Sequence, residues 1–199
     1  MVADPQHNDK IISVYGGIPM TAEAFEQLIN IESPYRYELI DGVAYDMTGS
    51  TPEHADITFN IMASLKEQLG KQGPCRVYQE QYVFIPGEPS VVPDVVVTCD
   101  VGDWEKDKRL KPFKIRSPLL VVEVLSPSTA SYDRSEKFKR YKQSPTLAVY
   151  MLVEQDERHV EVYRRATNWK RELFSSDHII KLDQLDLILP MAAIYEGLF

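Results

Sequence analysis

Hydrophobic and polar positions change their spacing several times along this chain, and each change predicts a structural element. The runs 35–40 and 43–47 alternate on either side of an Asp-Gly pair, which is typical of two strands joined by a tight hairpin turn. Just before them, apolar residues recur at helical spacing over 21–31, and Thr21 is a suitable N-cap. The fold is therefore expected to begin with a short helix and a β-hairpin.

A longer helix is predicted to end near Gly70, because four apolar residues before it form one stripe at helical spacing. The start of this helix can be capped in two ways. Ser50 can form a capping box with Glu53, or Thr51 can cap the helix with Pro52 at its first position.

Later stretches are rich in β-branched and aromatic residues and predict strands. They cover 76–85, 92–98, 147–154, 159–165 and about 169–175, with one more short strand and a helix from Pro190 in the tail. The run 118–125 is apolar at consecutive positions, as is typical of a central strand covered on both faces. A charged helix is expected from Ser131 to Lys142. This order predicts a mixed α/β fold with a central β-sheet flanked by helices.

Composition narrows the class of protein. A length of 199 residues predicts one domain, which we place at 16–199 after a flexible arm at 1–15. Because no long apolar stretch or signal core is present, we expect a cytoplasmic protein with no membrane contact. Cys75 and Cys99 match no metal-ligand spacing and are expected to be reduced thiols, with a disulfide between them as the alternative.

Two carboxylates interrupt apolar strands, which is the strongest chemical signal in the chain. Asp94 lies within 91–97 and Glu123 within 119–125, although carboxylates are rarely buried without a partner. A divalent cation would hold both and remove their repulsion. The alternative is a pair of strand-end carboxylates that form ion pairs with Arg or Lys.

A lysine follows these carboxylates on the charged helix. Asp133, Lys137 and Tyr141 are spaced by four residues and share one helix face, which can pack back along the strand that carries Glu123. A fixed ammonium near a metal site can stabilise charge that develops on a phosphate. The alternative for Lys137 is a surface ion pair with Asp133, which would contribute little.

These residues resemble a known group of nucleases. The chain is similar to the PD-(D/E)xK restriction-endonuclease-like superfamily, and more closely to a bacterial family of proposed restriction endonucleases of unknown function within it. The segments that carry the resemblance are 37–42, 54–65, 92–97, 120–129, 133–141, 160–163 and 189–195. The string Glu-Val-Leu-Ser-Pro-Ser-Thr from Glu123, followed by Asp-x-x-x-Lys from Asp133, is its most specific part.

The resemblance implies a restriction-endonuclease-like core and a bound Mg²⁺ or Mn²⁺. The implied ligands are Asp94, Glu123 and the carbonyl of Val124. One position departs from the pattern, because Leu125 stands where the superfamily places its lysine. In this family the role is thought to move to the next helix, which here means Lys137.

Other residues receive weaker assignments. Lys139 is the fallback for Lys137, although it lies off the face that holds Asp133 and Tyr141. Glu38 is a candidate further carboxylate of the site. His54 lies in the first turn of its helix, where a surface histidine is common, and the resemblance makes it a candidate neighbour of the site. Tyr141 fits the core better than catalysis, and Asp133 fits an orienting role.

Charge is distributed unevenly. The net charge of −8 argues against a dedicated nucleic-acid binder. However, 11 of the 22 basic residues lie between positions 105 and 142, next to the strand that carries Glu123. We expect a basic rim at 106–116 and 134–142 that contacts the phosphate backbone of DNA. The alternative is a solvated loop and helix face.

The leading hypothesis is a metal-dependent endonuclease that hydrolyses phosphodiester bonds of DNA. Asp94 and Glu123 would hold the metal, with Lys137 as the stabilising cation, and Glu38 and His54 beside them. The alternative is a catalytically inactive module that binds nucleic acid or protein, which predicts that the Lys137 ammonium points to solvent. A carboxylate pair acting on a sugar is a weaker third reading. Apolar edge strands near 147–165 and the resemblance predict a homodimer.

Overall fold

The computed structural model describes residues 17–31, 35–47, 49–70, 73–105 and 113–199. The predicted arm at 1–15 and residues 106–112 of the predicted basic rim lie outside these ranges.

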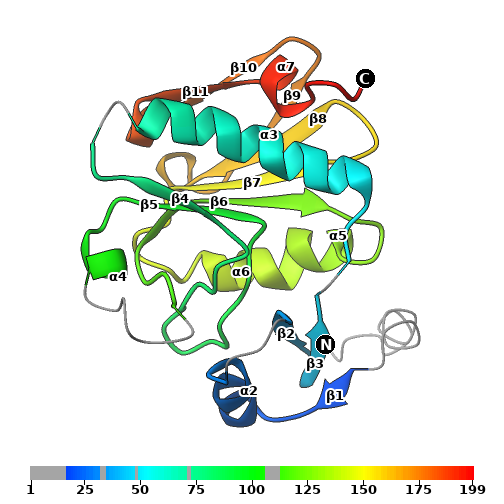
Figure 1. The fold of residues 1–199 in the computed structure, drawn as a ribbon, viewed down its shortest axis with the longest axis vertical. Coiled ribbons are helices and arrows are strands. Elements are labelled where there is room, and N and C mark those ends of the chain that lie inside the picture. Colours follow the sequence, from blue (N-terminus) through cyan, green and yellow to red (C-terminus); the bar gives the residue numbers. More distant parts are fainter. Residues whose placement is uncertain (1–16, 32–34, 48, 71–72, 106–112) are drawn as a thin grey trace.

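A six-stranded mixed sheet forms the centre of the molecule (Figure 1). Its order is β4-β5-β6-β7-β8-β9, and β6 and β7 are parallel while the other neighbours are antiparallel. The strands are β4 (Arg76–Gln79), β5 (Val95–Thr98), β6 (Pro118–Leu125), β7 (Val149–Glu154), β8 (His159–Arg164) and β9 (Arg171–Ser175). The expected mixed α/β fold is therefore confirmed, and β6 has its predicted bounds.

The expected apolar edge strands at 147–165 are wrong. Both β7 and β8 are paired on two sides, and the edges of the sheet are β4 and β9. The apolar character of β7 and β8 instead reflects burial of a central strand on both faces. The homodimer stays a prediction, now without this argument.

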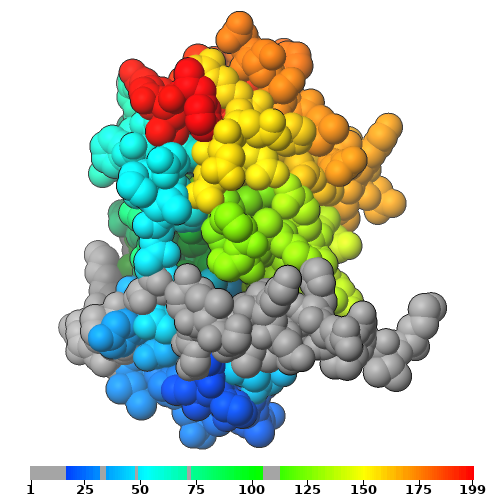
Figure 2. Space-filling model, turned by 90° about the vertical axis from the view of Figure 1, so that its right-hand side faces the viewer, coloured from blue at the N-terminus to red at the C-terminus, as the bar shows by residue number. Residues whose placement is uncertain are grey.

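Helix α3 (Pro52–Leu69) covers one face of the sheet together with the chain's end (Figure 1). Thr51 is its N-cap and Pro52 its first residue, so the second of the two predicted caps is the one formed. The tail forms a hairpin of β10 (Ile179–Leu182) and β11 (Leu187–Pro190), followed by α7 (Met191–Ile194). These elements enclose the largest hydrophobic cluster with the sheet, and Figure 2 shows the tail (red) at the opposite end of the molecule from the N-terminal elements (blue).

The opposite face of the sheet is covered by the charged helix, which is not a regular α-helix. It consists of α5 (Ala130–Tyr132), one π-helical turn (Asp133–Lys137) and α6 (Phe138–Tyr141). Phe138 stacks on Tyr150 of β7 with ring centroids 4.8 Å apart, within a second hydrophobic cluster. A π-turn inserts one extra residue into a helix and is frequent at functional sites. Here it carries Asp133 and Lys137.

A small N-terminal lobe packs below this helix (Figure 1). It contains β1 (Ile18–Pro19), α2 (Ala22–Ile29) and the predicted hairpin of β2 (Tyr37–Ile40) and β3 (Val43–Asp46). Asp41 and Gly42 both have positive φ, as the predicted tight turn requires. The lobe places Glu38 of β2 next to Val92, just before β5 of the central sheet.

The strands predicted at 76–85 and 92–98 are shorter than expected. β4 ends because Glu80 adopts a φ of 47°, and Val83 then forms isolated bridges to Val91 and Ile115. β5 begins after Pro93, which has no N–H to donate to a ladder. A short helix, α4 (Gly102–Glu105), follows β5.

The expectation of reduced thiols is also wrong, because Cys75 and Cys99 form a disulfide. Arg76 pairs with Thr98 across the antiparallel strands β4 and β5, so the two cysteines just beyond them face each other. Their sequence separation of 24 shows nothing of this pairing.

Candidate active site

The two predicted carboxylates meet at one end of the sheet. Glu123 lies on β6, and Asp94 directly precedes its antiparallel neighbour β5, in which Val95 pairs with Val122. Asp94 Oδ2 accepts a 2.6 Å hydrogen bond from the Val124 N–H. The side chain of Glu123 is 3% exposed and that of Asp94 is 20% exposed. One carboxylate is therefore buried and the other opens to solvent.

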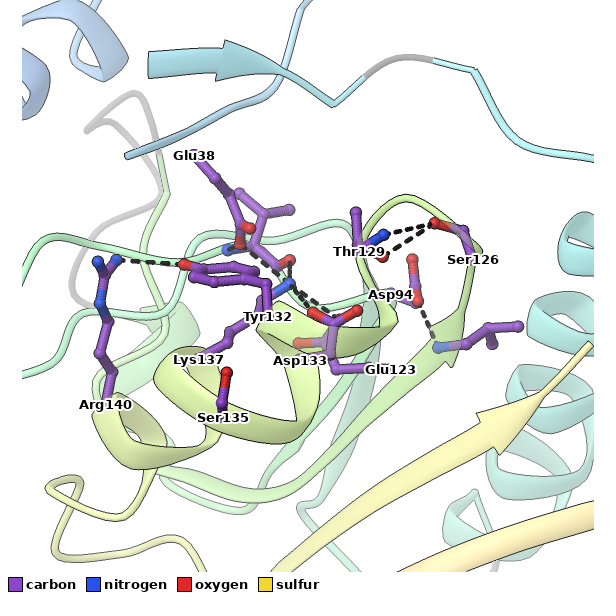
Figure 3. A network of polar contacts seen from close by, with 12 residues as sticks. Glu38, Asp94, Glu123, Ser126, Thr129, Tyr132, Asp133, Ser135, Lys137 and Arg140 are labelled. Atoms are coloured by element: carbon purple, nitrogen blue, oxygen red, sulfur yellow. Dashed lines mark hydrogen bonds and ion pairs between the residues drawn. The ribbon is translucent and has the colours of Figure 1, made fainter. Parts of the chain in front are cut away.

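Lys137 points into this end of the sheet (Figure 3). Its Nζ lies 3.0 Å from Glu123 Oε2, 3.0 Å from Glu38 Oε1 and 3.6 Å from Asp133 Oδ1. It also donates a 2.9 Å hydrogen bond to the carbonyl of Val92. The structure thus places the lysine of the π-turn beside Glu123, instead of on the surface.

Glu38 belongs to the same cluster, although it comes from the N-terminal lobe. It is fully buried, and its Oε1 accepts a 2.7 Å hydrogen bond from the Val92 N–H in addition to its ion pair with Lys137. Glu38 therefore holds both the Lys137 ammonium and Val92, which lies two residues before Asp94, in place.

The cluster has more negative than positive charge. Three buried carboxylates surround one ammonium, and three of their oxygens have no hydrogen-bond partner in the described part of the chain. These oxygens are Glu38 Oε2, Glu123 Oε1 and Asp133 Oδ1. Because buried carboxylates need compensation, the cluster favours the uptake of protons or of a cation.

The pKa values follow from this excess of negative charge. Burial raises the pKa of Glu123 well above its usual range, against the opposing charge of Lys137. Burial likewise raises the pKa of Asp133, to about 6. Burial acts to lower the pKa of Lys137, but the surrounding carboxylates outweigh it and raise that pKa well above its ordinary value. Lys137 therefore stays charged, and the three carboxylates share its single positive charge.

His54 lies beside Asp94, where the resemblance predicted a neighbour of the site. Its Nε2 is 3.3 Å from Asp94 Oδ2, and its backbone N–H donates to the Thr51 hydroxyl that caps α3. Burial acts to lower the pKa of His54, but the hydrogen bond and charge of Asp94, with smaller contributions from Glu80 and Val124, raise it.

Three further candidate residues have different surroundings. The Tyr141 side chain is buried in the core, as expected. Lys139 is 69% exposed and pairs with Glu136, so it does not reach the site. Asp133 is buried against Lys137 and fits the orienting role.

The residues fit a divalent cation in part. Among the described residues, no three His, Cys, Asp or Glu side chains are grouped as a metal shell. However, Glu123 Oε1 is buried and has no hydrogen-bond partner among the described residues, Asp94 offers carboxylate oxygens at the same end of the sheet, and the Val124 N–H donates to Asp94. Oxygen donors of this kind suit Mg²⁺ or Mn²⁺.

A pocket of about 740 Å³ joins these groups to solvent. Sequence reasoning missed several of its lining residues, among them Arg36, Tyr132 and Gln155. Gln155 directly follows β7, the parallel neighbour of β6, and the carboxyl ends of parallel strands share one edge of a sheet. That relationship could have indicated Gln155.

The described part of the predicted basic rim makes many contacts within the protein. Arg134 pairs with Glu154 and Glu161, and Arg140 donates to the Leu39 carbonyl. Lys139 and Lys142 have exposed side chains.

A family model matches most of this chain. Residues 22–192 match the model of a family described as "Uma2: Putative restriction endonuclease". The chain belongs to the Uma2 family. This membership supports a nuclease function in general terms, as the sequence predicted.

Two proteins of Synechocystis sp. are similar in sequence to this Uma2 protein. It is 30% identical over 167 residues to the uncharacterized protein slr1290 of Synechocystis sp., covering 82% of this chain and 85% of that one. It is 29% identical over 129 residues to the uncharacterized protein sll1609 of the same organism, covering 64% and 71%.

A solved structure shows the same fold. It is that of a putative nuclease belonging to DUF820 from Anabaena variabilis, with a TM-score of 0.69 and 22% sequence identity. The match covers 88% of this chain and 97% of that one. The restriction-endonuclease-like fold is therefore confirmed. None of the described helices has the length and apolar character needed to cross a membrane.

Proposed function

We propose that this Uma2 protein is a Mg²⁺- or Mn²⁺-dependent endonuclease that hydrolyses phosphodiester bonds of DNA. The observation that carries this proposal is the buried ammonium of Lys137, 3.0 Å from Glu123 and at the same end of the sheet as Asp94. An inactive binding module predicts that this ammonium points to solvent, more than ~6 Å from the carboxylates, where its attraction is weak. The observed contact favours catalysis over that alternative.

Asp94, Glu123 and the Val124 carbonyl would hold the cation. When bound there, it supplies Lewis acidity and neutralises charge on the phosphate. Lys137 stabilises the attacking hydroxide or the charge that develops on the phosphorane, because its ammonium is fixed and shielded from water. Glu38 and Asp133 hold the ammonium in place, and His54 orients Asp94.

The DNA would approach the open side of the pocket. The exposed Lys139 and Lys142 supply positive charge for the phosphate backbone in this proposal, whereas Lys114 of the predicted rim at 106–116 already pairs with Glu26. Such contacts would make binding weaken as salt concentration rises.

Cleavage of DNA by the purified protein with Mg²⁺ or Mn²⁺ tests the proposal. We expect Asp94→Asn and Glu123→Gln to abolish cleavage, because each removes a charged ligand while preserving its shape. Asp56→Asn is the matched control, since Asp56 is an exposed residue of α3 that does not line the pocket. Equal cleavage by all four proteins, or no metal-dependent cleavage by the wild type, would contradict the proposal.

A further inference from the structure

The pocket is much larger than a phosphate and a cation require. It encloses about 740 Å³, whereas a water molecule occupies roughly 30 Å³ of liquid and small-molecule sites span about 300–1,000 Å³. The cation ligands occupy one part of its wall. The remaining volume can hold another part of the substrate.

One wall of the pocket is apolar and aromatic. Ile40, Tyr45 and Met47 come from the N-terminal hairpin, and Tyr132 comes from α5. Together they form one hydrophobic cluster along the pocket, in which Tyr45 and Tyr132 are 5% and 7% exposed and Met47 is more exposed. A flat apolar group fits such a wall, since aromatic side chains are the surfaces on which nucleic-acid bases stack.

The charge of the lining disfavours a run of phosphates. Its acidic residues are Asp46, Glu80, Asp94, Glu123 and Asp133, against Arg36, Lys137 and His54. Lys137 is buried by its carboxylate partners, and Arg36 donates to the Glu80 carbonyl. One phosphate next to a bound cation can enter, whereas several consecutive phosphates meet repulsion.

A polar group also faces the pocket. The Thr51 hydroxyl accepts from the His54 N–H and donates its own hydrogen to Gln155 Oε1 at 2.8 Å. This arrangement turns the Gln155 amide NH₂ away from Thr51, and it makes no hydrogen bond to a described residue. Gln155 lines the pocket with 4% of its surface exposed, and its amide is a group of the kind that reads the edge of a base.

We propose that the pocket binds one unpaired nucleotide of the DNA substrate. Its base packs on the wall formed by Tyr45, Met47 and Tyr132 and its edge meets Gln155, while its phosphate lies at Asp94 and Glu123. This inference rests on the nuclease function proposed above and names its substrate class. A single strand or a bulged or flapped nucleotide enters directly, whereas a paired base must first leave the stack.

Binding to three probes of one sequence tests the inference without turnover. The probes are a single strand, a duplex with one unpaired nucleotide, and a fully paired duplex, with Ca²⁺ in place of the catalytic ion and fluorescence anisotropy as the readout. We expect the first two to bind at least about tenfold more tightly than the third, because their base reaches the aromatic wall at lower cost. Equal affinities, tightest binding of the paired duplex, or no binding of any probe would overturn the inference.

Variants of the wall provide the second measurement. Met47→Ala and Gln155→Glu should each weaken binding of the unpaired probes by about fivefold or more and leave the weak binding of the paired duplex unchanged. The control is Ile18→Ala, which truncates an exposed apolar residue of β1 outside the pocket and should change neither. Circular dichroism confirms that each variant is folded. Unchanged affinity in both wall variants would contradict the inference.

The two proposals fail in different ways. If the protein cleaves paired and unpaired DNA equally, and Asp94→Asn abolishes both reactions, the nuclease function stands and the nucleotide pocket is wrong. If no DNA is cleaved but unpaired probes still bind selectively, the nucleotide pocket stands and the nuclease function is wrong. Tighter binding of single-stranded RNA of the same sequence would overturn the assignment to DNA.

Discussion

The ammonium of Lys137 lies 3.0 Å from Oε2 of Glu123, although the two residues are 14 positions apart and belong to different elements. Leu125, on the same strand as Glu123, stands where the related superfamily places its lysine. A lysine from the following π-turn thus reaches the carboxylate that a strand lysine would otherwise accompany.

Removal of this charge should destabilise the protein. Lys137→Met keeps the approximate length of the side chain but leaves Glu38 and Glu123 buried without their cation, which typically costs about 3–5 kcal/mol. Urea denaturation at pH 7 measures the loss. The control Lys139→Met removes an exposed lysine and should change the free energy of unfolding by less than about 0.5 kcal/mol. Similar losses of stability in the two variants would show that the buried carboxylates do not depend on the Lys137 ammonium for stability.

The buried cluster should also make stability depend on pH. Burial raises the pKa of Asp133 to about 6 from its ordinary value of 3.8, so the folded protein binds more protons than the unfolded chain between these values. The contribution of Asp133 to the free energy of unfolding is fully present below pH 4 and is lost as the pH rises through 6. The total loss is roughly 3 kcal/mol.

The variant Asp133→Asn isolates this effect, since asparagine resembles the protonated carboxyl. The free energy of unfolding is measured for both proteins at pH 4 and pH 7. The wild type should lose stability relative to the variant over this interval. A difference that stays constant, or that grows in favour of the wild type, would contradict the raised pKa.

The N-cap of α3 should matter for activity as well as stability. Thr51→Ala removes a cap, at a typical cost of about 1 kcal/mol, and also releases Gln155 and the first turn that carries His54. Thr21→Ala removes the equivalent cap of α2, which is away from the pocket. Both variants should lose similar stability in thermal denaturation, but cleavage should fall only in Thr51→Ala. If both variants cleave DNA equally well, Thr51 has no positioning role.

The disulfide should stabilise the fold without affecting the site. It closes a loop between residues 24 positions apart, for which chain entropy predicts roughly 3 kcal/mol of stability. The double variant Cys75→Ser/Cys99→Ser should therefore unfold at a lower urea concentration and retain its cleavage rate, because Cys99 lies beyond the end of β5 that is opposite Asp94. Free thiols in the native wild type, detected by alkylation and mass spectrometry, would contradict the pairing.

Several features could be predicted because one local pattern determines each of them. The Asp-Gly pair predicted the hairpin, since both positions need positive φ. Consecutive apolar residues predicted the central strand β6, and two carboxylates within apolar runs indicated a site that needs compensation. Helical spacing predicted Lys137 on the face that packs back along the strand of Glu123, and the resemblance added His54. The structure places both residues in that region.

Other features depend on pairings that no local pattern encodes. Cys75 and Cys99 meet because β4 and β5 pair in a particular register, and β7 and β8 are interior because β9 joins the sheet beyond them. The burial of Lys137 depends on Glu38, which comes from a separate lobe. Glu38 was a candidate carboxylate for the site, but its ion pair with Lys137 follows from tertiary packing.

In the proposed function, Asp94 and Glu123 bind one divalent cation next to Lys137. A crystal of the wild-type protein soaked in Mn²⁺, with anomalous diffraction data, tests it most directly. We expect one anomalous peak at roughly 2.0–2.6 Å from oxygens of both Asp94 and Glu123. A well-diffracting soaked crystal with no peak there, or with manganese bound only elsewhere, would contradict it.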